Sequence, residues 1–403
     1  MQDHLYPWLM RVAAVYLFLF SAPTLAQGVE ENAAVLWANR LEDAIWAGQY
    51  DADMFNDRWF VREALRPFRL DQDEMVMFQD AGFSEALVET LTQAVANGGS
   101  YTFLRLRGEG VHTTALFRLH SEGGVNYHEW RLRQRGDGSV ESWDVEYYFT
   151  GERISETVRW NWVPLLNDVA PGYADHMDAE SRLRYRHWHD LDDLRHAAEA
   201  GRYSRVLALY DALPEPLQAL QKPMFFAMVA HLGLGDQAAH DQVRARYAEL
   251  YPDATDAELG LIDAMFVVGA YEGICDAADA LEARIGGDPQ LNILRADAVH
   301  LLGDYEQAKR FLDAGLAENP RELALIWRSI DLALFEEDWS RVSEMLTAAE
   351  AQGVELLDVR EVEGYEGYVA SGAYERWLAG DDDAGDGAAE GWNGVDSPEA
   401  PGE

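Results

Sequence analysis

The sequence predicts a multidomain protein in which an N-terminal α+β module, with helices on an antiparallel meander sheet, precedes an all-α solenoid. Helical periodicity over residues 30–97 changes at Tyr101 to alternation of apolar and polar residues. Helical periodicity then returns near Met177 and lasts almost to Leu378, with a repeat every 34 residues. Helices, then a meander, then repeated helices favour an α+β layer followed by stacked helix pairs.

The N-terminal module, expected over residues 30–165, opens with helices. The run ENAAVLWANRLEDAIWAG places Leu36, Leu41 and Ile45 near one face, and Gly48 stands where a helix ends. Four strand-like runs follow, at 101–110, 112–124, 125–138 and 139–152. Asp137-Gly138 predicts a tight hairpin turn between the last two, because glycine accepts left-handed backbone angles.

The order of these elements resembles the cone-shaped fold of the nuclear transport factor 2-like superfamily over about residues 30–160. That resemblance implies a ligand pocket of the kind used by isomerases and dehydratases, with a carboxylate or histidine inside the cone. The polar strand positions that would line such a pocket are Arg118, Tyr127, Glu129, Asp144 and Tyr148. There an acidic residue would act as general base beside a tyrosine donor. The alternative is that these residues are ordinary cross-strand pairs on a wet sheet face.

The helical region repeats. Turn-like positions recur at Gly201, Gly235, Gly269, Gly303 and Glu337 at intervals of 34 residues, and Gly372 follows 35 later. In the copy around Gly303, a small residue (Ala308), Leu312, Gly315 and Pro320 also fall in register. This period resembles the tetratricopeptide repeat (TPR), a helix–turn–helix unit that buries its apolar face only against neighbouring copies.

The resemblance implies a TPR-like α-solenoid of about five to six helix pairs over residues 185–378, after a linker at 166–184. Two copies depart from the pattern. His240 stands where a small residue is expected, and the Gly269 copy carries about three extra residues before Pro289.

In TPR proteins the first helix of each pair lines a concave groove for peptide segments. Here the residues six before the turn are Asp263, Asp297, Asp331 and Glu366, and those ten before it are Leu259, Ile293, Trp327 and Val362. Residues four apart share a helix face, so an acidic row is expected beside an apolar row. Such a groove suits a basic or amphipathic partner segment. The alternative is that acidic residues occupy any exposed position in so acidic a chain.

Charge narrows the range of partners. The chain carries 72 acidic and 32 basic residues, a net charge of −40, with Lys222 and Lys309 as its two lysines. Phosphate backbones should repel it, so no nucleic-acid partner is expected. An acidic surface attracts cationic proteins or peptides. Adaptation of a whole proteome to salt would produce the same composition.

The ends of the chain predict bacterial export. An apolar run after Arg11 ends in small residues, as in a signal peptide over residues 1–26 cleaved after Ala26. A periplasmic or secreted protein with no stable membrane span is expected, with an uncleaved anchor as the alternative. The acidic, glycine-rich residues 379–403 predict a disordered tail.

Motifs for catalysis are missing from the sequence: it contains no GxSxG, HExxH, CxxC, Walker or dinucleotide fingerprint. Cys275 is the only cysteine. His189, Asp193 and His196 share a helix face but have no fourth ligand. We therefore expect no cofactor and no metal, and leave enzymatic activity open. The sequence predicts an exported interaction or scaffold protein. The alternative is a small-molecule-binding α+β domain with a repeat array for docking.

Overall fold

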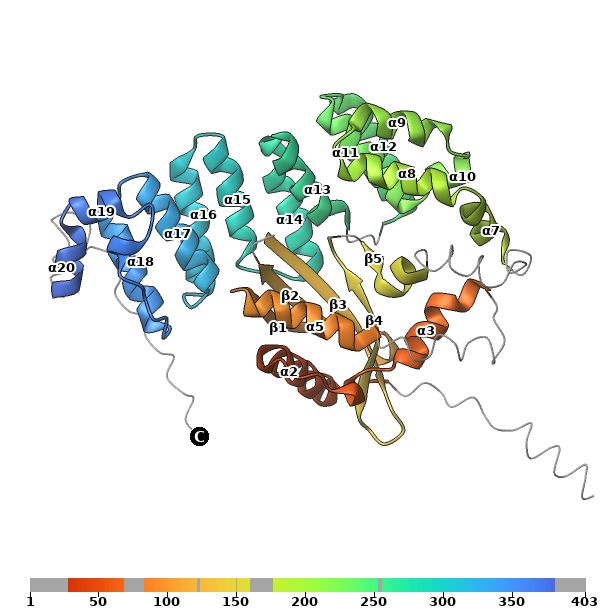
Figure 1. Ribbon diagram of the computed structural model, residues 1–403, viewed down its shortest axis with the longest axis horizontal. Helices are drawn as coiled ribbons and strands as arrows, with labels where there is room; N and C mark the ends of the chain where they lie inside the picture. The colour runs from red at the N-terminus through yellow and green to blue at the C-terminus, as the bar shows by residue number, and fades with distance from the viewer. Residues whose placement is uncertain are drawn as a thin grey trace, which may run out of the picture. The chain divides into compact units, whose positions relative to one another are not determined.

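The computed structural model describes residues 28–68, 83–121, 124–149, 151–159, 177–252 and 256–380. The chain forms two compact units, residues 1–270 and 271–403. Helices and an antiparallel sheet come first and are followed by helices alone, which confirms the predicted order of an α+β part and an all-helical part (Figure 1). The predicted signal peptide, and the tail beyond residue 380, lie outside the described residues.

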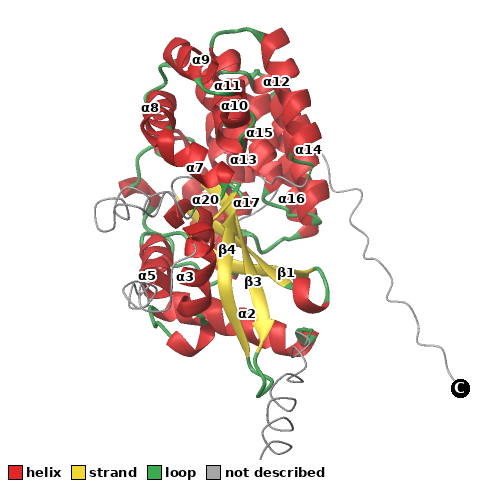
Figure 2. Ribbon diagram, turned by 90° about the vertical axis from the view of Figure 1, so that its right-hand side faces the viewer, coloured by secondary structure: helices red, strands yellow, loops and turns green. Residues whose placement is uncertain are grey.

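The sheet has five antiparallel strands in chain order, and Figure 2 shows its twist. They are β1 (Ser100–Arg107), β2 (Thr114–Ser121), β3 (Gly124–Gln134), β4 (Val140–Tyr147) and β5 (Glu152–Arg153). The four predicted strands are confirmed; β5, only two residues long, was not predicted. Gly138 has φ 89° in the turn between β3 and β4, as the Asp-Gly pair indicates.

One face of the sheet is covered by α2 (Glu31–Ala47) and α5 (Phe83–Ala96). Trp37, Tyr101, Phe117 and Trp130 meet in this core. The expectation for Leu36 is wrong: it is exposed, because the buried stripe of α2 runs through Trp37, one position further along the helix. The first unit also contains α3 (Asp57–Leu65) and the short helices η1 (Ala52–Met54), η2 (Arg66–Phe68) and η3 (Gly110–His112).

Residues 154–159 are also helical, and seven further helices follow them in the first unit. They are α7 (Ala179–Arg186), α8 (Trp188–Glu199), α9 (Tyr203–Ala212), α10 (Glu215–Gln218), α11 (Gln221–Gly233), α12 (Gln237–Leu250) and α13 (Asp256–Val268). Helices α7 to α12 share a core built mainly from leucine, methionine, tyrosine and alanine side chains, including Met224, Met228 and Tyr247.

The second unit is helical throughout its described residues. Its elements are η5 (Tyr271–Gly273), α14 (Ile274–Ile285), α15 (Leu291–Leu301), α16 (Tyr305–Glu318), α17 (Leu323–Phe335), α18 (Trp339–Ala351), η6 (Val359–Glu361), α19 (Glu366–Ala370) and α20 (Ala373–Ala379). Across the described helices of both units, none is both long and apolar enough to cross a membrane.

The 34-residue register is visible in the backbone. The six turn positions all have left-handed φ angles, from 58° at Glu337 to 84° at Gly303. Glu337 is the one non-glycine residue with positive φ in the described part of the chain. Aspartates cap the following helices: Asp236, Asp304 and Asp338 each accept a hydrogen bond from a backbone N–H three residues later.

The same register is visible in the packing. The residues five after the turn are each at most 1% exposed: Val206, His240, Ile274, Ala308 and Val342. His240, the departure from a small residue, is accommodated because its Nδ1 lies 3.1 Å from the carbonyl oxygen of Met228. The five copies from Gly201 to Glu337 thus bury the equivalent position whatever its side chain, while Trp377 in the Gly372 copy is half-buried.

Candidate functional site

Three of the four residues of the predicted acidic row lie in the second unit. Two of them, Asp297 and Asp331, are joined there by Arg328. The Arg328 Nε lies 2.5 Å from Asp297 Oδ1, and its Nη1 lies 3.6 Å from Asp331 Oδ2. Arg328 was not predicted, because it stands nine positions before the turn at Glu337, outside the two rows. Asp263 is exposed in the first unit.

Burial raises the pKa of Asp297, and the charges of Arg328 and His300 partly oppose that shift. Tyr365 lies close enough to Asp331 for its charge to matter: burial first, and then the Asp331 carboxylate, raise the pKa of Tyr365 to about 12. Glu366 accepts a 3.0 Å hydrogen bond from the Gly364 backbone N–H, so it is engaged with its own loop.

The four residues of the predicted apolar row are buried or half-buried. Leu259 is buried in the first unit and offers no anchor to a partner. Ile293 and Trp327 are half-buried and pack against the cores of the second unit, and Val362 is half-buried as well. Ile293 and Trp327 therefore contribute to the packing of the helices and keep part of their surface exposed.

Exposed apolar side chains lie instead at the ends of α15 and α17. The His300 and Phe335 rings are 4.9 Å apart between centroids, and Tyr305 lies 5.3 Å from Phe335. Phe335 is 59% exposed and Leu301 52%, and Leu302 is also exposed. We call His300, Leu301, Leu302, Tyr305 and Phe335 the edge patch.

The edge patch has a sequence signal that the prediction did not use. The residues two before the turns at Gly269, Gly303 and Glu337 are Val267, Leu301 and Phe335, which are all exposed, whereas the other three turns have Glu199, Gly233 and Ala370 there. An apolar residue beside a turn in consecutive copies indicates a repeated surface feature. Exposed acidic residues adjoin the patch in sequence: Asp304, Glu306, Glu336 and Glu337.

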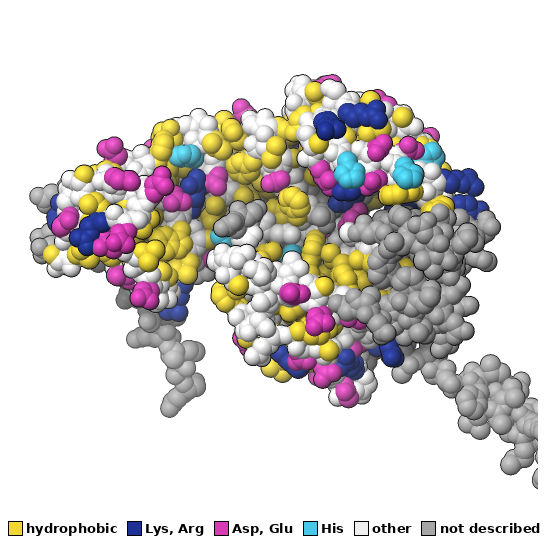
Figure 3. All heavy atoms as spheres, viewed as in Figure 1, with side chains coloured by type: hydrophobic (Ala, Val, Ile, Leu, Met, Phe, Trp, Pro, Cys, Tyr) yellow, Lys and Arg dark blue, Asp and Glu magenta, His cyan; other side chains and the backbone are white. Residues whose placement is uncertain are grey.

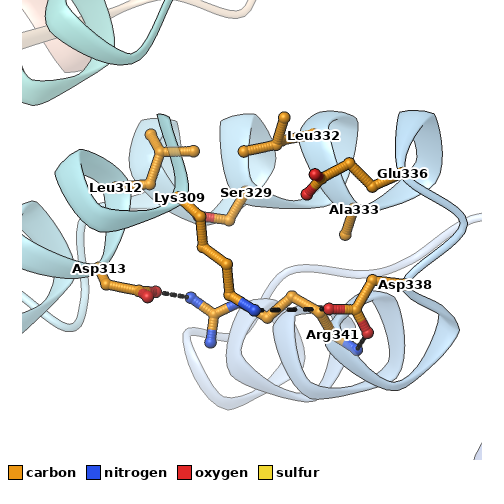
Figure 4. A pocket seen from close by; sticks show the side chains of 9 residues that line it. All are labelled: Lys309, Leu312, Asp313, Ser329, Leu332, Ala333, Glu336, Asp338 and Arg341. Carbon is orange, nitrogen blue, oxygen red and sulfur yellow. Dashed lines mark hydrogen bonds and ion pairs between the residues drawn. The ribbon is translucent and has the colours of Figure 1, made fainter. Parts of the chain in front are cut away.

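A notch between α16, α17 and α18 is too small for a ligand. Its volume is about 10 Å³, room for one water molecule. Figure 4 shows why: Lys309 reaches across it to Asp338, at 3.6 Å, while Asp313 and Arg341 point toward one another and pair at 2.5 Å. The charged groups of Lys309, Asp313, Asp338 and Arg341 are therefore taken up by one another.

In the sheet, two of the five predicted pocket residues form one hydrogen-bonded cluster. Tyr148 donates a 2.6 Å hydrogen bond to Glu129 Oε2, which also pairs with Arg107 at 2.7 Å. Thr114 donates to the other carboxylate oxygen at 2.5 Å. Burial raises the pKa of Tyr148, and the negative charge of Glu129 adds to that shift. Arg107 and Thr114 were not predicted.

The other three predicted residues divide between two places. Tyr127 packs edge-on against Tyr148, with ring centroids 5.9 Å apart, and is the cross-strand neighbour of Arg118. Asp144 belongs to a separate group, where it accepts hydrogen bonds from the hydroxyl of Ser155 at 2.6 Å and from its backbone N–H at 3.2 Å. Burial raises the pKa of Asp144.

An open cleft of about 290 Å³ lies beside the sheet in the first unit. Its lining includes Glu146, Arg153, Glu156, Gln221 and Tyr251. None of the five predicted pocket residues is part of this lining. Arg153 pairs with Glu156 at 2.5 Å and lies 3.9 Å from Asp144, so its charge is balanced inside the protein.

Within the described ranges, no three His, Cys, Asp or Glu side chains are placed to hold a metal ion. On α8, His196 approaches Asp192 at 3.3 Å rather than forming a group with His189 and Asp193. No protein-family model matches the chain, and no curated protein matches it significantly.

Proposed function

We propose that this chain is an exported, TPR-like scaffold protein of the bacterial periplasm or exterior, and that its second unit binds a cationic, amphipathic protein segment. The observation that carries the proposal is the edge patch, where large apolar side chains are exposed beside carboxylates. Scattered single hydrophobic residues are normal on protein surfaces, but a contiguous group of rings marks an interaction site.

The composition of this surface favours one class of partner. Phe335, Tyr305 and Leu301 offer apolar area for a partner's apolar residues. Asp297 connects the patch to the acidic row, because it hydrogen-bonds Arg328 and feels the charge of His300. Lysine or arginine side chains of a bound segment would meet Asp331, which is exposed, and the acidic residues adjoining the patch.

Arg328 sets the strength of this attraction. It already neutralises part of the charge of Asp297 and Asp331, so an incoming cation competes with an internal one. We expect affinity to come mainly from the apolar contacts, with charge supplying orientation and salt dependence.

The test uses a synthetic amphipathic helix of leucine and lysine, labelled with a fluorophore, and the full chain. Leu301→Ser combined with Phe335→Ser should weaken binding about ten-fold, because two exposed anchors are lost. Leu357→Ser is the matched control, since Leu357 is 77% exposed on the second unit outside the patch. Its affinity should equal that of the wild type.

A second experiment tests the contribution of charge to binding. Changing Asp297, Asp331 and Glu366, the acidic-row residues of the second unit, to asparagine or glutamine should weaken binding at low salt and flatten its salt dependence. A matching leucine–glutamate helix should not bind the patch. The proposal fails if Leu301→Ser/Phe335→Ser and Leu357→Ser bind the leucine–lysine helix with the same affinity.

A further inference from the structure

A basic and aromatic cluster lies on the first unit, where α3 meets β3 and β4. The Arg133 guanidinium stacks over the Trp59 ring at 4.5 Å from its centroid, and Arg62 lies over the same ring at 5.7 Å. The Trp143 and Trp59 rings contact each other edge-on, with centroids 6.5 Å apart. The Arg131 guanidinium lies over the Trp143 ring, 6.0 Å from its centroid. Guanidiniums from α3 and β3 thus lie over two indoles that contact each other. We call these five residues, with Arg58, the Arg–Trp surface.

This surface has more positive charge than its neighbours balance. Arg133 and Arg135 share one carboxylate, Glu141, at 2.8 and 2.5 Å. The ion pair of Arg131 is a longer one: its Nη2 lies 3.6 Å from Glu146 Oε2. Arg58 and Arg62 are exposed, and neither forms an ion pair with a residue that the structure describes. A local cationic excess is unexpected in a chain of net charge −40.

The stacking also fixes how the cations are presented. A guanidinium over the face of an indole can still direct edge N–H groups to a carboxylate, as Arg133 does to Glu141. Trp59 is 40% exposed, so apolar area lies between the donors. The cation–π contacts alone would stabilise the packing of α3 on the sheet. They do not account for the unpaired charges of Arg58 and Arg62.

We propose that the Arg–Trp surface binds a short acidic peptide segment of a partner protein. Carboxylates would pair with Arg58, Arg62 and Arg131, and an apolar side chain would contact Trp59. The net charge of the whole chain argues for a short ligand. A membrane surface or a nucleic acid is large and anionic, so the acidic residues elsewhere on the protein would repel it. A short peptide extends no more than about a Debye length from the cluster, so this repulsion acts on it less.

The test uses the full chain and a fluorescein-labelled octaglutamate peptide at low salt. Arg58→Gln combined with Arg62→Gln should weaken binding about ten-fold. Glutamine preserves helix propensity, so α3 should stay folded. The matched control is Arg202→Gln with Arg205→Gln, two exposed arginines of the same unit that make no ion pair with a described residue. It changes the net charge equally and should leave the affinity unchanged.

Three results would overturn the proposal. The first is a wild-type protein that does not bind octaglutamate at low salt. Equal losses in both double variants would mean that net charge, not this surface, governs binding. Tighter binding of phosphatidylglycerol vesicles or of a short oligothymidylate, with the same sensitivity to Arg58→Gln/Arg62→Gln, would assign the surface to a lipid or a nucleic acid instead.

Discussion

Glu337 has a left-handed backbone, φ 58°, at the turn where the five equivalent residues are glycines. A side chain costs free energy in this conformation because its Cβ crowds the following carbonyl oxygen. The turn is kept because the helices on either side, α17 and α18, share a packed core with α19 and α20.

Replacing Glu337 with glycine should therefore stabilise the protein, by about 1 kcal/mol in the free energy of unfolding. Chemical denaturation of the wild type and of Glu337→Gly measures this difference in the free energy of unfolding. Glu336→Gly is the control: Glu336 has φ −84°, so glycine relieves no strain there and should lower stability slightly. A lower midpoint for Glu337→Gly than for the wild type would refute the strain.

His128 is a buried histidine in the core of the first unit. Its ring stacks on Tyr147 at 4.2 Å, and its Nδ1 lies 3.3 Å from the Tyr101 hydroxyl. Burial lowers the pKa of His128 to about 3, so the ring stays neutral in the folded state at pH values where an exposed histidine is charged.

Stability should consequently fall as the pH falls. The unfolded chain takes up a proton at His128 near pH 6.5, and the folded chain does not until about pH 3. This one group should remove about 2 kcal/mol of unfolding free energy between pH 7 and pH 5. Denaturant unfolding of the wild type and of His128→Gln at pH 7 and pH 5 measures this loss of unfolding free energy. Equal pH dependence in the two proteins would contradict the assignment.

At the level of secondary-structure elements, Glu129 connects three strands. It accepts hydrogen bonds from Thr114 on β2 and from Tyr148 just after β4, and pairs with Arg107 on β1. Its polar contacts lie on the sheet face opposite the core of α2 and α5. We interpret this cluster as a structural tie, because each of its polar groups has a partner inside the cluster.

Glu129→Gln should lower the free energy of unfolding by about 2 kcal/mol, since an amide cannot satisfy Arg107, Thr114 and Tyr148 together. Glu109→Gln, at an exposed position of the same domain, should change stability by less than about 0.5 kcal/mol. If both variants unfold at the same denaturant concentration, the cluster contributes nothing to the packing of the sheet.

The sequence predicts most of these elements because their periodicity is strong. Strands β1 to β4 alternate since one face packs on helices and the other is polar, whereas β5 is too short to show a pattern. The helix turns follow from glycine spacing. Contacts between side chains of different elements are harder to predict from the sequence. Arg328 forms an ion pair with Asp297 on a different helix, and Asp144 accepts a hydrogen bond from Ser155 and is not part of the Glu129 cluster. Such pairs depend on how helices and strands are placed in space, which periodicity does not specify.

At the scale of the whole molecule, charge is distributed unevenly. On the face drawn in Figure 3, acidic side chains are widespread, while lysine and arginine are fewer. Against this background the second unit exposes an apolar patch beside carboxylates, and the first unit exposes arginines stacked on tryptophans. Two surfaces of opposite character suit a scaffold that holds two different partners.

The surface proposed on the second unit is tested most directly by hydrogen exchange on the full chain, with and without the leucine–lysine helix. We predict slower exchange at the ends of α15 and α17 and in the turn around Gly303, and no change in the sheet. Protection confined to the sheet, or none at a peptide concentration that saturates binding, would contradict the claim that the edge patch is the binding surface.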